Sequence, residues 1–146
     1  MAPRTIDGPA AEQEAWSQLQ CYTLAHGDPA FIHQHAVDAW TAQHAEARNP
    51  TIALAFALIG LYLHVERGFS GRQVQRVHML LGKRRRQWPE FALPEERGVV
   101  SVVDVMAVSA GAGRDLAIDQ WCASVWDAFS GSRQAIIGLL AEHGII

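Results

Sequence analysis

The feature that most constrains the fold is an apolar segment near the middle of the chain, residues 52–63, in which every residue is apolar or glycine. A run of about a dozen residues is too short to cross a bilayer, which takes about 20. It is typical instead of a helix surrounded by other elements, because a surface helix keeps one polar face. We therefore expect a central, buried helix over residues 51–67.

Helix start and stop signals divide much of the remaining chain. Gly68 is placed to end the central helix in the left-handed conformation, and Ser70 with Gln73 has the pattern of a capping box that starts the next helix. Asp28 followed by Pro29 predicts another helix start at residue 28. The expected helices cover residues 10–26, 28–45, 51–67, 70–86, 101–108, 114–129 and 132–143.

No strand-like segment, repeat or low-complexity tract interrupts this pattern. The prolines Pro89 and Pro94 exclude a continuous helix and predict a loop over residues 87–98. A chain of 146 residues can build one core without a disulfide or a metal. The sequence therefore predicts an all-α fold, a compact bundle of five to six helices in a single domain over residues 10–146, preceded by a disordered tail over residues 1–9.

Charge and cysteine content narrow the class of protein. The net charge is −3, which argues against a dedicated nucleic-acid binder, and we expect neither nucleic acid nor a membrane as a partner. Only 18% of the residues are charged, so apolar patches would stay exposed on a monomer, which favours a homodimer. Cys21 and Cys122 lie far apart without metal-ligand spacing, as expected of reduced thiols in a cytoplasmic protein.

Titratable side chains gather in residues 28–44, which hold three of the seven histidines. On a helix, His35 and Asp38 share one face, while His33, Trp40 and His44 lie on the opposite face. The i, i+3 spacing would let the Asp38 carboxylate hydrogen-bond the His35 imidazole, fixing its tautomer and raising its basicity. Such a pair can act as a general acid/base, and it is equally half of a metal site or a structural hydrogen bond.

The central helix adds two further candidates. His64 lies near its C-terminal end, where an antiparallel neighbour would bring it close to the start of the 28–45 helix. The helix dipole also favours a histidine there without any function. We take as catalytic candidates His35, Asp38 and His44, and as substrate-binding candidates Trp40, Tyr62 and His64.

Other motifs point to no specific chemistry. There is no P-loop, dinucleotide-binding loop or zinc-protease motif, and we expect no cofactor and no metal. The basic run at residues 83–86 closes a helix, where cations complement the helix dipole, and we expect it to be a solvated face.

Five local motifs extend along most of the chain: Asp28-Pro29-Ala30-Phe31, His35-x-x-Asp38-Ala39-Trp40-x-x-Gln43-His44, Leu63-x-x-Glu66-Arg67-Gly68, Val102-x-Asp104-Val105 and Ser124-Val125-Trp126-x-Ala128-Phe129. Together they resemble an uncharacterised bacterial family of unknown function that is common in actinobacteria. The resemblance covers about residues 12–142 and implies no activity.

The chain also departs from this family. Relatives typically carry a Cys-Pro-x-Cys-type segment near the start, a histidine at the position of Ala57, and a His-His pair at the position of Ser132-Arg133. If those histidines form a metal site in relatives, the chain described here has lost much of it.

Two functions of different classes fit these residues, and a third ranks below them. The first is a small-molecule enzyme or binding protein with an inter-helix pocket that uses a His35–Asp38 acid/base pair. The alternative is a homodimeric helical interaction module without catalysis, and the third is a metal-binding protein. A solvent-open cavity at His35 and Asp38 favours the first, whereas a filled core in which these two residues pair favours the second.

Overall fold

The structure is a computed structural model that describes residues 8–146, and its regular elements there are all helical. The elements are α1 (Pro9–Ala25), α2 (His33–Gln43), α3 (Thr51–Arg67), α4 (Gly71–Arg84), α5 (Val102–Ala107), α6 (Ala112–Ala128), the 3-10 turn η1 (Ser130–Ser132) and α7 (Arg133–Glu142). The predicted all-α fold is confirmed. In the described part the α-helices number seven, one for each helical range expected from the sequence, although the bundle was expected to hold five to six. Of the predicted tail, residues 1–7 lie outside the described residues, and Pro9 already begins α1.

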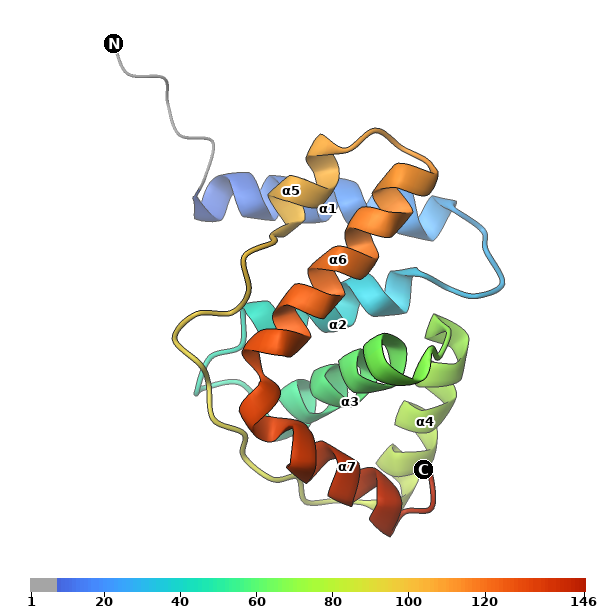
Figure 1. Ribbon diagram of the computed structural model, residues 1–146, viewed down its shortest axis with the longest axis vertical. Coiled ribbons are helices and arrows are strands. Elements are labelled where there is room, and N and C mark those ends of the chain that lie inside the picture. Colours follow the sequence, from blue (N-terminus) through green and yellow to red (C-terminus); the bar gives the residue numbers. More distant parts are fainter. Residues whose placement is uncertain (1–7) are drawn as a thin grey trace.

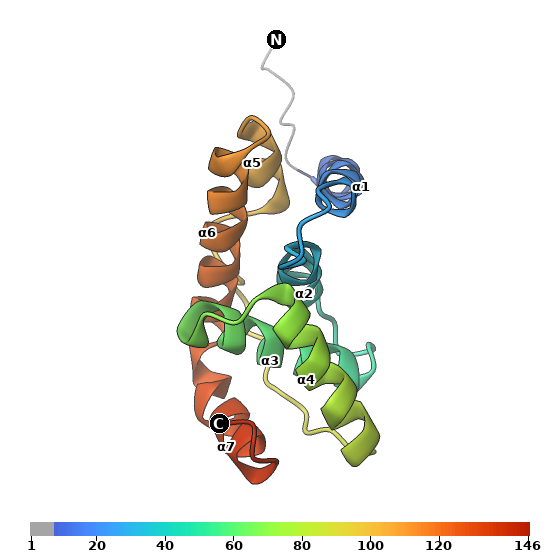
Figure 2. The same cartoon turned by 90° about the vertical axis from the view of Figure 1, so that its right-hand side faces the viewer.

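The helices form two layers with α3 between them. Figure 2 shows α5, α6 and α7 on one side and α1, α2 and α4 on the other. The long α6 runs from the end of the molecule that holds α1 and α5 to the end that holds α7 (Figure 1). Helix α3 packs against α2, α4, α6 and α7, and α2 also packs against α6. Helices α2, α3 and α6 therefore meet in the centre of the fold.

The central position of α3 follows from its apolar sequence. Leu54, Ala55 and all of residues 57–63 are buried, while Ile52 in its first turn stays exposed. Gly68 ends the helix with φ 69°, and the Phe69 N–H donates to the Leu63 carbonyl at 2.9 Å. The predicted helix and its stop signal are confirmed. Among residues 8–146 no helix is long and apolar enough to cross a membrane.

The predicted start of α2 is wrong, because the N-cap is Ile32, four residues after the predicted N-cap Asp28. Asp28 and Pro29 do not open the helix; instead the Asp28 carboxylate accepts the N–H of Ile32 at 3.2 Å, and its carbonyl accepts that of Phe31 at 3.1 Å. Phe31 has φ 62°, a left-handed conformation that costs a non-glycine residue energy and interrupts a helix. The helix begins only at His33, and residues 28–32 form a loop.

Packing of this loop on α4 accounts for the unusual backbone of Phe31. The Ala30 carbonyl accepts the N–H of Arg72 at 2.9 Å, which satisfies one of the free donors in the first turn of α4. At Gly71 a Cβ would lie 1.8 Å from the Phe31 carbonyl oxygen, so only glycine allows the close approach. The loop is thereby held over the start of α4. That start is the predicted capping box, in which Ser70 and Gln73 bond each other's backbone N–H groups.

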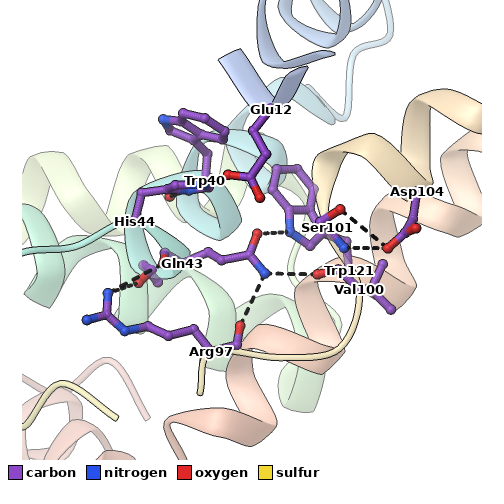
Figure 3. Close-up of polar contacts among 10 residues, drawn as sticks. Glu12, Trp40, Gln43, His44, Arg97, Val100, Ser101, Asp104 and Trp121 are labelled. Carbon is purple, nitrogen blue, oxygen red and sulfur yellow. Dashed lines mark hydrogen bonds and ion pairs between the residues drawn. The ribbon is translucent and has the colours of Figure 1, made fainter. Parts of the chain in front are cut away.

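A second long segment, residues 85–101, is joined to the bundle by several side chains, among them Gln43 of α2 and Ser124 of α6. Figure 3 shows the Gln43 amide nitrogen donating to the carbonyls of Arg97 and Val100, while its oxygen accepts from the Trp121 indole. The Arg97 guanidinium in turn reaches the carbonyls at the end of α2, including that of Ala45. Gln43 therefore joins α2 to α6 and to the long loop, and its three hydrogen bonds all serve to hold these parts together.

Candidate functional site

The centre of the candidate site is a pair of stacked imidazoles. His35 on α2 lies over His64 on α3, with ring centroids 3.5 Å apart and planes inclined by 15°. The sequence expectation that His64 approaches the start of α2 is confirmed. This stack lies where α2 and α3 meet α6.

His64 is held at both of its ring nitrogens. Nδ1 lies 3.1 Å from the Phe69 carbonyl, and Nε2 lies 2.8 Å from the Asp119 carboxylate on α6. The two contacts fix the His64 ring between the end of α3 and the middle of α6.

His35 differs from every other histidine of the chain. All seven histidines lie in the described residues, and six of them have a hydrogen-bond or ion-pair partner there. The side chain of His35 is only 5% exposed, and its Nδ1 is buried without a partner among these residues. Burial, and then the neighbouring His64, lower the pKa of His35 to about 3. His35 is therefore a neutral imidazole with free hydrogen-bonding capacity.

The expected hydrogen bond between His35 and Asp38 is absent. The Asp38 carboxyl accepts instead from the Gln34 amide at 3.0 Å, and its Oδ2 is buried without a partner among the described residues. The reason is helix geometry, because side chains lean toward the N-terminus and Gln34 lies one turn back at i−4. Burial raises the pKa of Asp38 well above its usual value, against the smaller lowering effect of Gln34. The carboxyl is thus a buried, proton-binding group rather than an orienting carboxylate.

Asp38 also explains a glycine within the apolar helix α3. A Cβ at Gly60 would lie 1.9 Å from Asp38 Oδ2 and 2.6 Å from its Cγ. Such distances are far inside van der Waals contact, so the Asp38 carboxyl occupies space that any other residue at position 60 would fill. The crossing of α2 and α3 is therefore set by this pair. Behind the two residues, the Cys122 thiol of α6 lies 3.5 Å from the His35 carbonyl.

A pocket of about 320 Å³ opens at the stacked histidines. It lies between the 28–32 loop, the end of α3, the start of α4 and the middle of α6, and its apolar wall includes Ile32 and Phe69. The polar residues that line it are Asp28, His35, His64, Ser70, Gln73 and Asp119. The pocket borders His35 but not Asp38. Three other surface pockets, of about 290, 370 and 350 Å³, border the 85–101 segment and contain no histidine.

The remaining predicted site residues lie elsewhere. His44 bonds the Glu12 carboxylate through Nε2 at 2.7 Å and the Trp40 carbonyl through Nδ1 at 3.0 Å. Trp40 lies between His44 and Trp16, with ring centroids 3.7 and 4.9 Å away. These residues join α1 to the outer face of α2. Tyr62 is buried on another side of α3, edge-on to the Trp126 ring. The structure thus brings together only His35 and His64 at the pocket.

Metal ligands do not converge at this site. Within residues 8–146 no group of three or more histidine, cysteine or acidic side chains has an arrangement that could hold a metal ion. His64 has both nitrogens engaged, and Asp38 is turned toward Gly60. The positions at which relatives are expected to carry histidines hold a buried alanine, Ala57, and Ser132-Arg133. The arginine of that pair forms two parallel hydrogen bonds to Glu66.

Sequence reasoning missed several residues of the pocket. Asp119 was not a candidate, because its pairing with His64 depends on where α6 crosses α3, and no local pattern encodes that crossing. Asp28, Ser70 and Gln73 were assigned only to helix starts. A usable signal was present at Gly60, since glycine weakens a helix interior and often marks a close approach.

Comparison with family models shows that the chain belongs to a family of unknown function (DUF5946), whose model matches residues 9–130. The match covers most of the chain and includes α1 to α6. No curated protein sequence and no solved structure matched the chain.

Proposed function

We propose that the chain binds a small molecule in the His35 pocket, as an enzyme or a binding protein, with His35 as the group that accepts a hydrogen bond from the ligand. The observation that carries the proposal is the free imidazole of His35, which is nearly buried, neutral and at the edge of a pocket. A buried polar group without a partner costs free energy. Because His35 lines the pocket, a ligand that reaches its ring can supply a hydrogen bond that the described residues leave unmade.

The role of each neighbour follows from its contacts. His64 is not the group that meets the ligand, because both of its nitrogens are engaged, and its ring instead supports that of His35 from behind. Burial first, and His64 second, lower the pKa of His35, so its ring stays neutral and can accept a hydrogen bond. Asp38 is not the orienting partner in this proposal, since its carboxyl bonds Gln34 and lies against Gly60.

The charge of the lining limits the ligand. Neither lysine nor arginine lines the pocket, whereas the carboxylates of Asp28 and Asp119 both do. The Asp119 carboxylate bonds His64, and among residues 8–146 that of Asp28 meets only a backbone N–H. We therefore infer that the ligand is uncharged or cationic, with O–H or N–H donors, rather than a phosphate.

A fragment screen tests this proposal. Amines, polyols and other donor-rich compounds are screened by thermal shift and by backbone amide NMR on the wild type, His35→Gln and His33→Gln. His33 is the matched control, because it lies on the same helix and does not line the pocket. Ligands should shift the resonances of Ile32 and Phe69 and bind about tenfold more weakly to His35→Gln alone. Equal affinity for both variants, or no ligand at millimolar concentration, contradicts the proposal.

A homodimer and a cytoplasmic location are further proposals. Leu24 and Leu116 are exposed large apolar residues on α1 and α6, whose ends are joined by the hydrogen bond from Tyr22 to Asp115. A second copy that covers this surface would remove these exposed apolar side chains from water, which favours a dimer. Light scattering of the purified protein should then give twice the chain mass, and a monomer at micromolar concentration contradicts it.

A further inference from the structure

The charge of the chain is distributed very unevenly. Seven of its 12 lysines and arginines fall within residues 67–86, and no acidic residue lies between Glu66 and Glu90. The rest of the chain carries the other five cations against all 15 acidic residues. The net charge of −3, from which we expected no membrane partner, therefore averages a strongly basic segment with a strongly acidic remainder.

The structure places much of this basic segment on one face of α4. Arg72, Arg76, Met79 and Lys83 are spaced i, i+4, i+7 and i+11, so they form a single row about 16 Å long. All four are exposed, and the opposite side of the helix buries Val74, Val77 and Leu81. Figure 2 shows α4 at one side of the molecule, with no other element beyond it. We call Arg72, Arg76, Met79, Leu80 and Lys83 the basic face.

The cations of the basic face are free of acidic partners. In the described part of the chain, Arg72, Arg76 and Lys83 form no ion pair, although Arg72 bonds Gln75 and lies over the Phe31 ring. The adjacent Arg85 does pair, with Glu142. The unpaired charges repel one another, and they gain most from an external anionic surface.

Exposed apolar side chains lie within this row of charges. Met79 is 64% exposed and Leu80 36%. Met79 falls between Arg76 and Lys83, so any partner that contacts both cations also contacts the methionine. A polar partner such as a nucleic acid duplex matches the charges but offers little to the apolar groups. An anionic bilayer offers phosphates and carboxylates at its surface and hydrocarbon just below them.

We propose that the basic face docks the protein peripherally on an anionic lipid surface, with the cations at the headgroups and Met79 and Leu80 at the boundary with the acyl chains. This inference is independent of the ligand pocket. It requires no spanning segment, and α4 stays packed on the bundle through its buried side.

Vesicle co-sedimentation of the full chain tests the proposal. Vesicles of phosphatidylcholine with about one-third phosphatidylserine are compared with pure phosphatidylcholine, at about 0.1 M and about 0.5 M salt. Each cation near an anionic surface contributes about a fivefold gain in binding. Arg76→Gln/Lys83→Gln should therefore weaken binding about 25-fold, and raised salt should weaken it further.

Matched variants separate the basic face from net charge and from general apolarity. Gln13→Glu/Gln134→Glu makes the same change of net charge on exposed positions of α1 and α7, and should bind almost as the wild type. Met79→Gln should weaken binding several-fold, whereas Val99→Gln, at an exposed apolar side chain outside α4 and outside the proposed dimer surface, should not. Equal binding to neutral and anionic vesicles, or equal loss in the two charge variants, overturns the proposal. Tighter binding of an RNA or DNA duplex through the same cations also overturns it, in favour of a nucleic-acid partner.

Discussion

Substituting Gly60 by alanine should destabilise the protein, although alanine is the better helix former. In an open helix interior the exchange gains about 1 kcal/mol. At position 60 the new Cβ would lie 1.9 Å from Asp38 Oδ2 and 2.6 Å from Cγ. Restoring ordinary contact requires a displacement of more than about 1 Å, and the fully buried carboxyl has no route to solvent.

Overpacking of this kind costs more than the gain in helix propensity, and we expect a net loss of about 2–4 kcal/mol in the free energy of unfolding. For a chain of this length the melting temperature should fall by about 5–15 °C. Circular dichroism melts and urea titrations would measure both quantities. Gly138→Ala is the matched control, because that exposed glycine lies within α7 with no atom near its Cβ position, and it should stabilise slightly.

A double-mutant cycle then assigns the cost to one contact. In an Asp38→Ala background the obstructing carboxyl is gone, so Gly60→Ala should become neutral or stabilising, with a coupling energy of at least about 2 kcal/mol. If Gly60→Ala is as stable as the wild type, or equally harmful with and without Asp38, the packing described for α2 and α3 is wrong.

Three further predictions concern stability and composition. Burial lowers the pKa of His35 to about 3 and of His78 to about 4. Above about pH 6.5 both rings are neutral in the folded and the unfolded chain, so the free energy of unfolding keeps its full value. Below that pH the unfolded chain binds protons that the folded chain does not, and the free energy of unfolding falls. Unfolding curves should show a loss of about 3 kcal/mol for each by pH 4, and a His35→Gln or His78→Gln variant with an unchanged pH dependence would contradict this. Gln43→Ala removes two hydrogen bonds to the 85–101 segment and one from the Trp121 indole; it should cost about 2–4 kcal/mol in chemical denaturation and speed proteolysis of that loop, whereas a thermally silent variant would refute the role of Gln43. Elemental analysis of purified protein should find no stoichiometric zinc, iron or manganese, and one tightly held metal ion that is lost in His35→Ala would reverse that expectation.

The positions of helices and loops could be predicted from the sequence wherever a local residue pattern determines them. The apolar segment placed α3, the residues around Gly68 and Ser70 placed the turn into α4, and Pro89 with Pro94 placed the long loop. The start of α2 was wrong because Asp28-Pro29 also suits a tight turn. The choice between them is made by a long-range contact, the packing of residues 30–31 on α4, which no local pattern records.

The candidate site was predictable to a smaller extent. The spacing on α2 put His35 and Asp38 on the buried face, and the pairing of α2 with α3 brought His64 to His35 as expected. Whether Asp38 bonds His35 depends on side-chain direction, and the alternative donor Gln34 lies where an aspartate side chain on a helix points. The part played by Asp119 depends on the crossing of α6 over α3, which only the assembled fold defines.

The most direct test of the proposed site is the protonation of His35. Long-range ¹H–¹⁵N NMR spectra of the imidazole nitrogens distinguish a neutral ring from an imidazolium, and the His35→Gln variant assigns the His35 signals. Because the pKa of His35 is lowered to about 3, we expect its ring to be neutral at pH 5 and still neutral at pH 4. A His35 that titrates near pH 6.5 would contradict the free, neutral imidazole on which the proposed pocket depends.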